Sequence, residues 1–302
     1  MKVLITGVEG QLGYALKHSS PKFINGREIK LFTTNRNQLD FSSPSLCYQY
    51  IIDLKPDWVI NAAAFTAVDL AEEQHNLSYK VNSESPREIA KALNEIGGKL
   101  IHISTDYVFK GDSGKPYKTF DKRYPLNTYG KSKAMGEDNI RNVFSDQNNA
   151  IILRTSWLMG AVGKNFVLKM LHLIEEKNML KVISDQVSAP TSTRSLSDIC
   201  WRLITNVTEG KNVSPVLHWS DAGVASWYDV AYAISEFGES FNLIKKAANI
   251  VPVKSSEYPT IAVRPSFSVL DISDTILEIG QSPLNWRHEL MKTVRQISLY
   301  AR

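Results

Sequence analysis

Short apolar segments alternate with helical segments through the first half of the chain. Five segments are apolar enough to form buried strands, at 2–6, 29–34, 57–64, 99–105 and 150–156. Helical patterns lie between them, at 11–18, 44–54, 80–96 and 130–143. Strands with little polar alternation are typical of a parallel sheet that is covered on both faces. The pattern therefore predicts an α/β fold built on a doubly wound parallel sheet.

The second half of the chain is less regular. Helical patterns occur at 164–177, 195–205, 226–237 and 284–300, and strand-like segments at 180–184 and 216–220. Residues 251–271 contain three prolines and are predicted to form an extended arm. We expect residues 1–156 to form a Rossmann-type NAD(P)-binding domain, joined by some elements from the second half. Residues 157–302 should form mainly a smaller C-terminal α/β substrate-binding domain.

The composition excludes several classes of partner. The chain has 302 residues, of which 43 % are hydrophobic and 22 % charged, and its formal net charge is +4. No basic run could follow a nucleic-acid backbone, so we expect no nucleic-acid partner. Cys47 and Cys200 fit no metal or redox spacing and are predicted to be reduced thiols. No segment has the length of a signal peptide's apolar region or a membrane span, so we expect a cytoplasmic protein without a membrane partner.

A glycine motif, TGVEGQLG, follows the first predicted strand and opens the first helix. Gly7 allows a tight turn, Gly10 allows close approach of a pyrophosphate, and Gly13 allows close helix packing. Gln11 and Leu12 lie at the helix N-terminus, where N–H groups face the phosphates. The motif predicts a dinucleotide site; the alternative is only a tight strand–helix turn.

Two further segments extend this predicted cofactor site. Arg36 follows the second strand, where it could meet the 2′-phosphate of NADPH, whereas a carboxylate there would favour NADH. Arg36 could equally be a solvated loop residue, so NADPH is preferred and NADH remains the alternative. Asp40 and Phe41 lie near the expected adenine edge. The small residues that end the third strand leave room for the cofactor: Ala62, Ala63 and Ala64.

The segment YPLNTYGKSK carries the predicted catalytic pair. Tyr129 and Lys133 are four residues apart, so they share one face of the predicted helix. A nearby ammonium lowers the pKa of a phenol from about 10 toward neutral pH, where acid catalysis is efficient. Thr105 ends the fourth strand, where its hydroxyl could hydrogen-bond the same carbonyl oxygen. Alone, the pair could be two surface residues; after the glycine motif and this strand it predicts carbonyl reduction.

The chain resembles the extended short-chain dehydrogenase/reductases, and among them the dTDP-4-dehydrorhamnose reductase family. The resemblance is carried along nearly the whole chain by LITGVEGQLG, HISTDYVF, PLNTYGKSKAMGE, LRTSWL, SDQVSAPT and YPTIAVRPSFSVLD. It implies NADPH-dependent reduction of the C4 ketone of a nucleotide-linked 6-deoxyhexose. The first candidate is dTDP-4-dehydro-L-rhamnose, reduced to dTDP-L-rhamnose in deoxysugar and cell-surface polysaccharide biosynthesis.

The resemblance also implies roles for individual residues. Tyr129 would be the proton donor, Lys133 would hold the ribose, and Thr105 would polarise the carbonyl. The residues that it places at the sugar nucleotide are Thr105, Asp106, Tyr107, Trp157, Asn165, Gln186 and Arg264. Trp157 could instead be a core tryptophan. Arg264 could be a surface residue, but its place in the arm favours a guanidinium that clamps the diphosphate.

Several positions depart from the family pattern, among them Thr119 and Phe120, which stand where the family usually has acidic residues. Phe267 and Val269 stand where the family commonly has an asparagine and a basic residue, which bears on base and sugar specificity. Some members bind magnesium through glutamates at a dimer interface; Ala15 and Arg194 occupy two such positions here. We therefore expect no metal site, and a monomer or a weak homodimer.

Three other functions remain open from the sequence. The protein could be another nucleotide-sugar 4-ketoreductase, or an epimerase that retains and recycles NAD. It could also be a non-catalytic, NADP-binding regulatory subunit. In the first two cases the expected partner is still a nucleotide sugar.

Overall fold

A six-stranded parallel sheet forms the centre of the protein. The computed structural model describes residues 1–144 and 149–300. The strands lie in the order β12-β7-β6-β5-β1-β4, and every neighbouring pair is parallel. Their bounds are β1 Lys2–Thr6, β4 Lys30–Thr34, β5 Trp58–Asn61, β6 Lys99–Thr105, β7 Ala150–Thr155 and β12 Val216–His218. The fold class predicted from the alternating pattern is confirmed.

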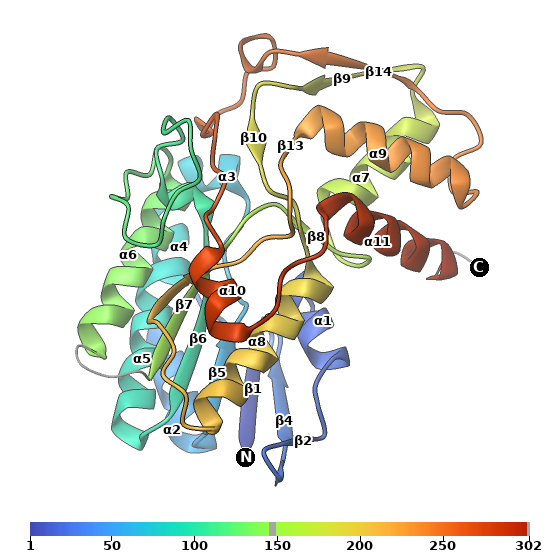
Figure 1. The fold of residues 1–302 in the computed structure, drawn as a ribbon. Helices are drawn as coiled ribbons and strands as arrows, with labels where there is room; N and C mark the ends of the chain where they lie inside the picture. The colour runs from blue at the N-terminus through green and yellow to red at the C-terminus, as the bar shows by residue number, and fades with distance from the viewer. Residues whose placement is uncertain (145–148, 301–302) are drawn as a thin grey trace.

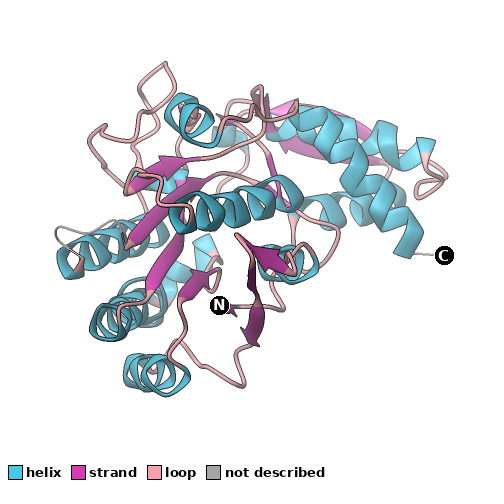
Figure 2. Ribbon diagram, turned by 60° about the horizontal axis from the view of Figure 1, so that its bottom comes forward, coloured by secondary structure: helices cyan, strands magenta, loops and turns pink. Residues whose placement is uncertain are grey.

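Helices cover both faces of this sheet (Figure 2). On one face α1 (Gln11–His18) packs against α8 (Thr193–Thr208), and their apolar side chains meet those of β1. On the other face α2 (Pro44–Leu54), α5 (Ser85–Ile96) and α6 (Thr128–Val143) form a second apolar cluster with the sheet. All six residues of β7 are buried, as expected for an inner strand with two covered faces.

A second group of elements lies above the carboxyl ends of these strands in Figure 1. It contains α7 (Phe166–Glu176), α9 (Trp227–Ser240) and α11 (Trp286–Tyr300), which share one apolar cluster. Strand β9 (Met179–Ile183) pairs in parallel with β14 (Asn249–Val253) beside them. The arm expected at 251–271 therefore begins inside a strand.

The chain crosses between the two groups more than once. Strand β12 returns from the second half to pair with β7, and α10 (Ser273–Ile279) packs against α8 and β12. The shorter elements are β2 Phe23–Ile24, β3 Arg27–Glu28, α3 Val68–Glu73, α4 His75–Tyr79, η1 Lys80–Glu84, η2 Asp106–Val108, β8 Leu158–Met159, β10 Val187–Ser188, β11 Thr191–Ser192, β13 Ala225–Ser226 and η3 Ser255–Glu257. None of the helices in the described ranges is both long enough and apolar enough to cross a bilayer.

Two predicted elements differ from the structure near the cleft. The strand expected at 57–64 ends at Asn61, because the backbone then turns to bond the side chain of Asn82 at both N and O of Phe65. The helix expected at 80–96 begins as the π-helical turn η1, which contains Asn82. The alanines after β5 are thus a loop held by η1, not the end of a strand.

Gly136 sets how closely α6 approaches η1. A Cβ atom at this position would overlap the carbonyl oxygen of Asn82. A glycine inside a helix costs roughly 0.5–1 kcal/mol relative to alanine. The close approach of α6 to η1 explains why that cost is tolerated here.

Changing Gly136 to alanine should lower the free energy of unfolding by about 1–3 kcal/mol, since the added methyl group overpacks the contact with Asn82. At an unconstrained helix position the same change would instead be stabilising. Urea unfolding followed by circular dichroism measures the sign and size of the change in the free energy of unfolding. Met135→Ala, at the exposed neighbouring position, is the control and should change stability by less than about 0.5 kcal/mol. A more stable Gly136→Ala protein would show that the helices are not in tight contact.

Candidate active site

The glycine motif forms a backbone cradle where β1 meets α1. Gly7 has a φ of +69°, and a Cβ there would lie 2.9 Å from Cα of Ala63, in the loop after β5. At Gly13 a Cβ would overlap the carbonyl oxygen of Gly7. Gly10 caps α1 and has no side chain to cover the N–H groups of the first turn. The cradle therefore admits a phosphate against the N-terminus of α1 and fits a dinucleotide.

The cradle opens into a cleft with two lobes. The larger lobe has a volume of about 450 Å³ and the smaller about 260 Å³, and both are lined by Glu9, Gly10, Ala62 and Ala64. They lie where the strand order reverses between β1 and β5, at the carboxyl ends of both strands. Ligands of open α/β sheets bind at this switch point.

The smaller lobe holds the residues expected at the adenosine end of the cofactor. Gly7, Arg36, Asp40, Phe41 and the three alanines 62–64 all line it. The Arg36 side chain is 76 % exposed, with Nε 3.9 Å from Asp40 Oδ1. A hydrogen bond from the Ser42 backbone N–H lowers the pKa of Asp40. Arg36 is therefore a long, exposed, positively charged side chain at this lobe. Its distance to Asp40 is too long for a tight ion pair.

The larger lobe brings together Thr105, Tyr129 and Lys133, with Gln11 and Leu12 beside them. Thr105 is the last residue of β6, and Tyr129 lies in the first turn of α6, whose N-cap Asn127 accepts a hydrogen bond from Gly130 N at 2.8 Å. These elements converge because α6 packs against η2, directly after Thr105. The predicted catalytic residues therefore share one cavity.

The pKa of Tyr129 is shifted in the direction opposite to the one expected. Burial raises the pKa to about 12, the Thr105 hydroxyl opposes this shift, and Asp106 adds to it. The amine of Lys133 binds polar atoms of β6: Nζ lies 2.6 Å from Ile103 O and 3.1 Å from His102 Nε2. Tyr129 therefore holds its proton firmly.

Lys133 is 2 % exposed, an unusual environment for an amine. Burial lowers its pKa to about 8, and the negative charge of Glu137 opposes that shift. Glu137 lies one turn further along α6. The protonation state of Lys133 is therefore sensitive to a few neighbouring polar groups.

Asp106 connects Thr105 to the second half of the chain through hydrogen bonds. Thr105 Oγ1 donates to Asp106 Oδ1 at 3.1 Å, while Ser188 and Ser268 donate to Oδ2 at 3.3 and 2.5 Å. Burial raises the pKa of Asp106 to about 6, and the three hydroxyls oppose the shift. The carboxylate thus fixes the rotamer of Thr105 next to Tyr129.

Aromatic side chains form the opposite wall of the larger lobe. Trp157 stacks on Trp227 with ring centroids 3.6 Å apart, and Phe166 tilts against Trp227 at 4.7 Å. Trp157 has a φ of +41°, a conformation that costs about 1–3 kcal/mol in a residue other than glycine. Backbone strain of this kind is typical of functional sites, and it favours a ligand role for Trp157 over a core role.

The other residues expected at the sugar nucleotide are placed differently. Asp106, Tyr107 and Asn165 line the larger lobe, but the Asn165 amide also caps α7, accepting from Leu168 N at 3.0 Å. Gln186 lies behind the wall, where its Oε1 accepts from Trp227 Nε1 at 3.2 Å. Arg264 pairs with Asp69, its Nη2 2.6 Å from Oδ2. Gln186 and Arg264 therefore stand just outside the lining of this lobe.

Several lining residues were not singled out from the sequence. Phe166 and Trp227 belong to the aromatic wall, and Trp227 begins a helix after the capping serine of SWYDVA, a readable signal. Thr155, opposite Thr105 in the sheet, has a buried Oγ1 with no hydrogen-bond partner among the described residues. The Oε1 atom of Gln11 is also buried and has no hydrogen-bond partner among the described residues. Both oxygens are available to polar groups of a ligand.

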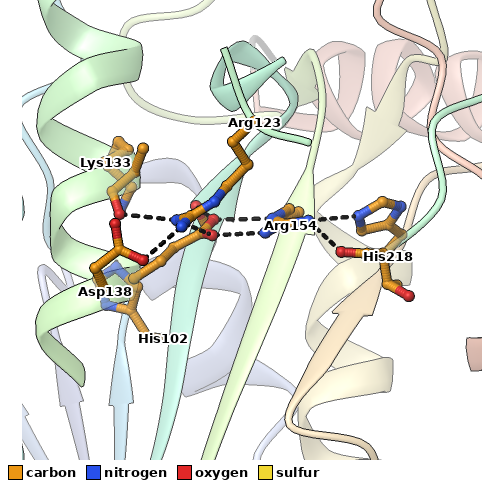
Figure 3. Close-up of polar contacts among 10 residues, drawn as sticks. His102, Arg123, Lys133, Asp138, Arg154 and His218 are labelled. Atoms are coloured by element: carbon orange, nitrogen blue, oxygen red, sulfur yellow. Dashed lines mark hydrogen bonds and ion pairs between the residues drawn. The ribbon is translucent and has the colours of Figure 1, made fainter. Parts of the chain in front are cut away.

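A buried ionic network supports α6 from below the cleft (Figure 3). Arg154 of β7 binds Glu137 through two hydrogen bonds, of 2.9 and 2.7 Å, and Arg123 Nη1 adds a third at 3.0 Å. Ser104 Oγ donates to the same carboxylate at 2.5 Å. Arg154 and Arg123 lower the pKa of Glu137 against the effect of burial. His218 lies 3.2 Å from Arg154, and burial lowers its pKa to about 4.

The described part of the chain holds no group of three His, Cys, Asp or Glu side chains that could bind a metal ion. Arg194, one of the two positions noted in the sequence, forms an ion pair with Glu289.

Glu137→Gln should lower the free energy of unfolding at pH 7 by about 3–5 kcal/mol, because it leaves the buried Arg154 without a carboxylate. The folded-state pKa of Glu137 is lowered, so its contribution is present above the unfolded value of 4.5 and is lost as the pH falls below it. The difference in the free energy of unfolding between the wild type and Glu137→Gln should therefore become smaller at acid pH. Asp138→Asn, the exposed neighbour that also contacts Arg123, is the control and should cost about 0–1 kcal/mol. Equal losses in the two variants, measured by urea unfolding, would contradict the network.

Comparisons with known proteins agree with the site. The family described as the RmlD substrate binding domain matches residues 1–299. The dTDP-4-dehydrorhamnose reductase of Burkholderia thailandensis is 37 % identical over 306 residues, which cover 98 % of this chain and 99 % of the relative.

Solved structures give the same answer. The dTDP-4-dehydrorhamnose reductase of Clostridium acetobutylicum is 33 % identical, with a TM-score of 0.88, and the match covers 98 % of this chain and 99 % of the other. The enzyme of Bacillus anthracis, solved in complex with NADP, is 32 % identical with a TM-score of 0.86 and the same coverage. The resemblance found in the sequence motifs is confirmed. This chain belongs to the dTDP-4-dehydrorhamnose reductase family, whose RmlD substrate binding domain spans nearly its whole length.

Proposed function

We propose that the protein uses NADPH to reduce the C4 ketone of dTDP-4-dehydro-L-rhamnose, giving dTDP-L-rhamnose. The observation that carries the proposal is the meeting of Thr105, Tyr129 and Lys133 in one cavity beside the glycine cradle. The relatives named dTDP-4-dehydrorhamnose reductase support the substrate, and the NADP complex of one of them supports the cofactor. The product is a precursor for cell-surface polysaccharide, made in the cytoplasm.

The cofactor would lie across both lobes of the cleft. Its pyrophosphate would meet the backbone at Gly7 and Gly10, its 2′-phosphate would meet Arg36, and its adenine would lie near Asp40 and Phe41. When bound, the dihydronicotinamide supplies the hydride. Ala62, Ala63 and Ala64 leave the backbone accessible where the two lobes join, and Gly13 keeps α1 close enough to present its N–H groups.

The proton is supplied by Tyr129. Its phenol donates a proton to the C4 oxygen as negative charge develops there, and Thr105 donates a hydrogen bond to the same oxygen. Thr105 can turn from Asp106 to the substrate with a rotation of one hydroxyl. Lys133 binds the ribose hydroxyls and places a positive charge near the phenolate that results.

The sugar nucleotide would lie against the aromatic wall. Trp157 packs on the apolar face of the deoxysugar, while Asp106, Tyr107 and Asn165 offer polar groups from the lining. Gln186 acts through Trp227, whose indole it holds. Arg264 interacts with Tyr107, so its guanidinium stands one side chain from the cavity and can bind the diphosphate.

Residues 1–156 bind mainly the cofactor, and residues 157–302 bind mainly the sugar nucleotide. Strand β12 and α8 are the returning elements, since they belong to the second half but pack in the central sheet layer. We propose that the protein acts as a monomer or a weak homodimer, without a metal ion.

Arg36→Ala should raise the KM for NADPH about tenfold and leave the KM for NADH nearly unchanged, because only NADPH carries the phosphate that the guanidinium would bind. Initial rates at varied concentrations of each cofactor give the two KM values and their ratio in wild type and variant. Arg27→Ala, an exposed arginine of β3, is the control for the loss of one positive charge. An equal effect on both cofactors would exclude Arg36 as the 2′-phosphate ligand.

Tyr129→Phe should reduce kcat by at least about a hundredfold, since the general acid is removed, while the Kd for NADPH stays within about threefold. NADPH oxidation with dTDP-4-dehydro-L-rhamnose measures turnover, and chromatography identifies dTDP-L-rhamnose. Tyr124→Phe, an exposed tyrosine just before α6, is the matched control.

The same assay separates the alternatives. A wild-type protein that purifies with bound NAD and changes the substrate without net NADPH oxidation is an epimerase. A protein that binds NADP but turns over no nucleotide-sugar ketone is a regulatory subunit. Undiminished turnover in Tyr129→Phe would overturn the role of Tyr129 alone.

A further inference from the structure

A line of polar side chains crosses the interior of the sheet directly beneath the catalytic lysine. Thr6 of β1, Asn61 of β5 and His102 of β6 are paired across neighbouring strands, so they share one face of the sheet. Their side chains connect in order: Thr6 Oγ1 to Asn61 Oδ1 at 2.7 Å, Asn61 Nδ2 to His102 Nδ1 at 3.0 Å, and His102 Nε2 to Lys133 Nζ at 3.1 Å. We call these four residues the polar ladder.

Every member of the polar ladder is hidden from solvent. Thr6 and His102 are 0 % exposed, Asn61 is 1 % and Lys133 is 2 % exposed. Burying an imidazole and an amide inside an apolar sheet is costly unless their hydrogen bonds are made. The catalytic step described above uses only the lysine at the end of this line. His102 and Asn61 therefore need a separate explanation.

The imidazole of His102 is held neutral. Burial lowers its pKa far below the usual value, and the nearby Lys133 lowers it further. A neutral imidazole has one nitrogen that donates and one that accepts. It can accept at Nε2 from an ammonium, or donate at Nε2 to a neutral amine, depending on which nitrogen carries the proton.

The other members of the line can follow either tautomer. A half-turn of the Asn61 amide exchanges its donor and its acceptor, and the Thr6 hydroxyl can donate or accept. In the structure the amide nitrogen of Asn61 faces His102, which suits an imidazole with its proton on Nε2. The line can therefore present either an acceptor or a donor to Lys133 Nζ, according to the tautomer of His102.

We propose that His102 is a positioning residue for the reaction, which holds the amine of Lys133 toward the sheet and keeps it paired whether charged or neutral. This inference rests on the proposed reductase function. Besides His102, the only partner of Nζ among the described side chains and backbone is Ile103 O. Without the imidazole, the long lysine side chain would be held by one contact at the edge of a cavity of about 450 Å³.

Two titratable groups act on the amine of Lys133: Glu137 of α6, whose negative charge favours the ammonium, and His102 of β6, which is neutral and contacts Nζ. Tyr129 and Asp106 line the same cavity as Lys133. Arg154 of β7 and Arg123, before α6, bind Glu137 and offset its charge. Because the His102 imidazole is neutral, a neutral substitution there changes the hydrogen bonding of Lys133 and leaves the net charge around it unchanged.

Two substitutions separate the contacts of the imidazole. In His102→Gln the terminal amide reaches the position of Nε2, so the contact with Lys133 is kept. In His102→Asn the shorter amide reaches only the position of Nδ1, so the contact with Asn61 is kept and that with Lys133 is lost. Both variants retain a buried polar amide in β6.

His102→Asn should lower kcat about ten- to a hundredfold and move the basic limb of the kcat–pH profile to lower pH, because the ammonium loses an acceptor. His102→Gln should stay within about threefold of wild type, with the limb unmoved. The control is His218→Asn, the same change at a neutral buried histidine of β12 that contacts Arg154. Figure 3 shows His218 at the opposite end of the drawn group from Lys133 and His102. His218→Asn should lower the thermal stability of the protein without moving the basic limb of the kcat–pH profile.

The outcomes are distinct. If wild type fails to reduce the ketone, the proposed function fails, and the assay says nothing against the ladder. If wild type is active and His102→Asn matches it in kcat and pH profile, the inference is wrong. Equal losses of kcat in His102→Asn and His102→Gln, with the basic limb of the kcat–pH profile unmoved, would show that His102 has only a structural role. A loss of kcat in His102→Asn no larger than that in His218→Asn would show the same. Either result would overturn the inference.

A measurement on the unchanged protein tests the ladder independently of activity and of how well the variants fold. Nitrogen-15 NMR of the histidine side chains, with His102 assigned from the spectrum that lacks it, reports protonation and tautomer. We expect the His102 imidazole to remain neutral through the pH range in which a solvated imidazole titrates, and to exchange tautomers as Lys133 titrates. Ordinary titration near pH 6.5 would show a solvated imidazole and overturn the inference.

Discussion

A charged amine that water does not reach has to be stabilised by the protein itself, and the region under the cleft is organised around this requirement. Lys133 is 2 % exposed and meets only polar atoms of β6 at its Nζ. One turn along the same helix, Glu137 supplies a negative charge that is itself held by Arg154. Removing any of these groups leaves another buried and unpaired. The lysine, the ladder and the ionic network are therefore one structural unit, and the sheet must carry polar residues where an ordinary core would be apolar.

This requirement explains why the cleft lies where it does. Strands β1 and β5 diverge into loops on opposite sides of the switch point, and Gly7 lets the first loop approach Ala63 in the second. The same strands carry Thr6 and Asn61 just before those loops. The cradle for a phosphate and the support for the lysine are thus built from consecutive residues. A shift of one strand would disturb both, which makes the geometry of the site a property of the sheet rather than of its loops.

The sequence predicted the central sheet and most of its helices because each has a strong local period. It missed α3, α4 and α10, which are too short to show one. It also missed the pairing of β9 with β14, which joins Met179–Ile183 to the distant segment Asn249–Val253. Thr105, Tyr129 and Lys133 could be proposed as catalytic residues because they lie in motifs, and the structure places all three in one cavity. His102 and Arg154 were visible only as polar residues inside apolar strands. Their partners lie on other strands and on α6, so no local pattern could name them. Arg264 was expected at a diphosphate, but without that ligand its strongest neighbour is Asp69.

The raised pKa of Tyr129 fits a reductase better than the lowered value expected from the Tyr–Lys spacing. An acid that must donate to a developing alkoxide needs to be protonated when the substrate arrives, and burial ensures this with a pKa of about 12. An alkoxide is a stronger base than a phenolate, so donation remains favourable even from so weak an acid. In the mechanism that we propose, the positive charge of Lys133 is then required mainly after donation, when the phenolate has to be stabilised. Holding the amine toward the sheet in the ligand-free state costs nothing in that sequence, provided that the amine stays ordered and close. Order at Lys133, rather than a permanently acidic Tyr129, is therefore what the polar residues beneath it provide.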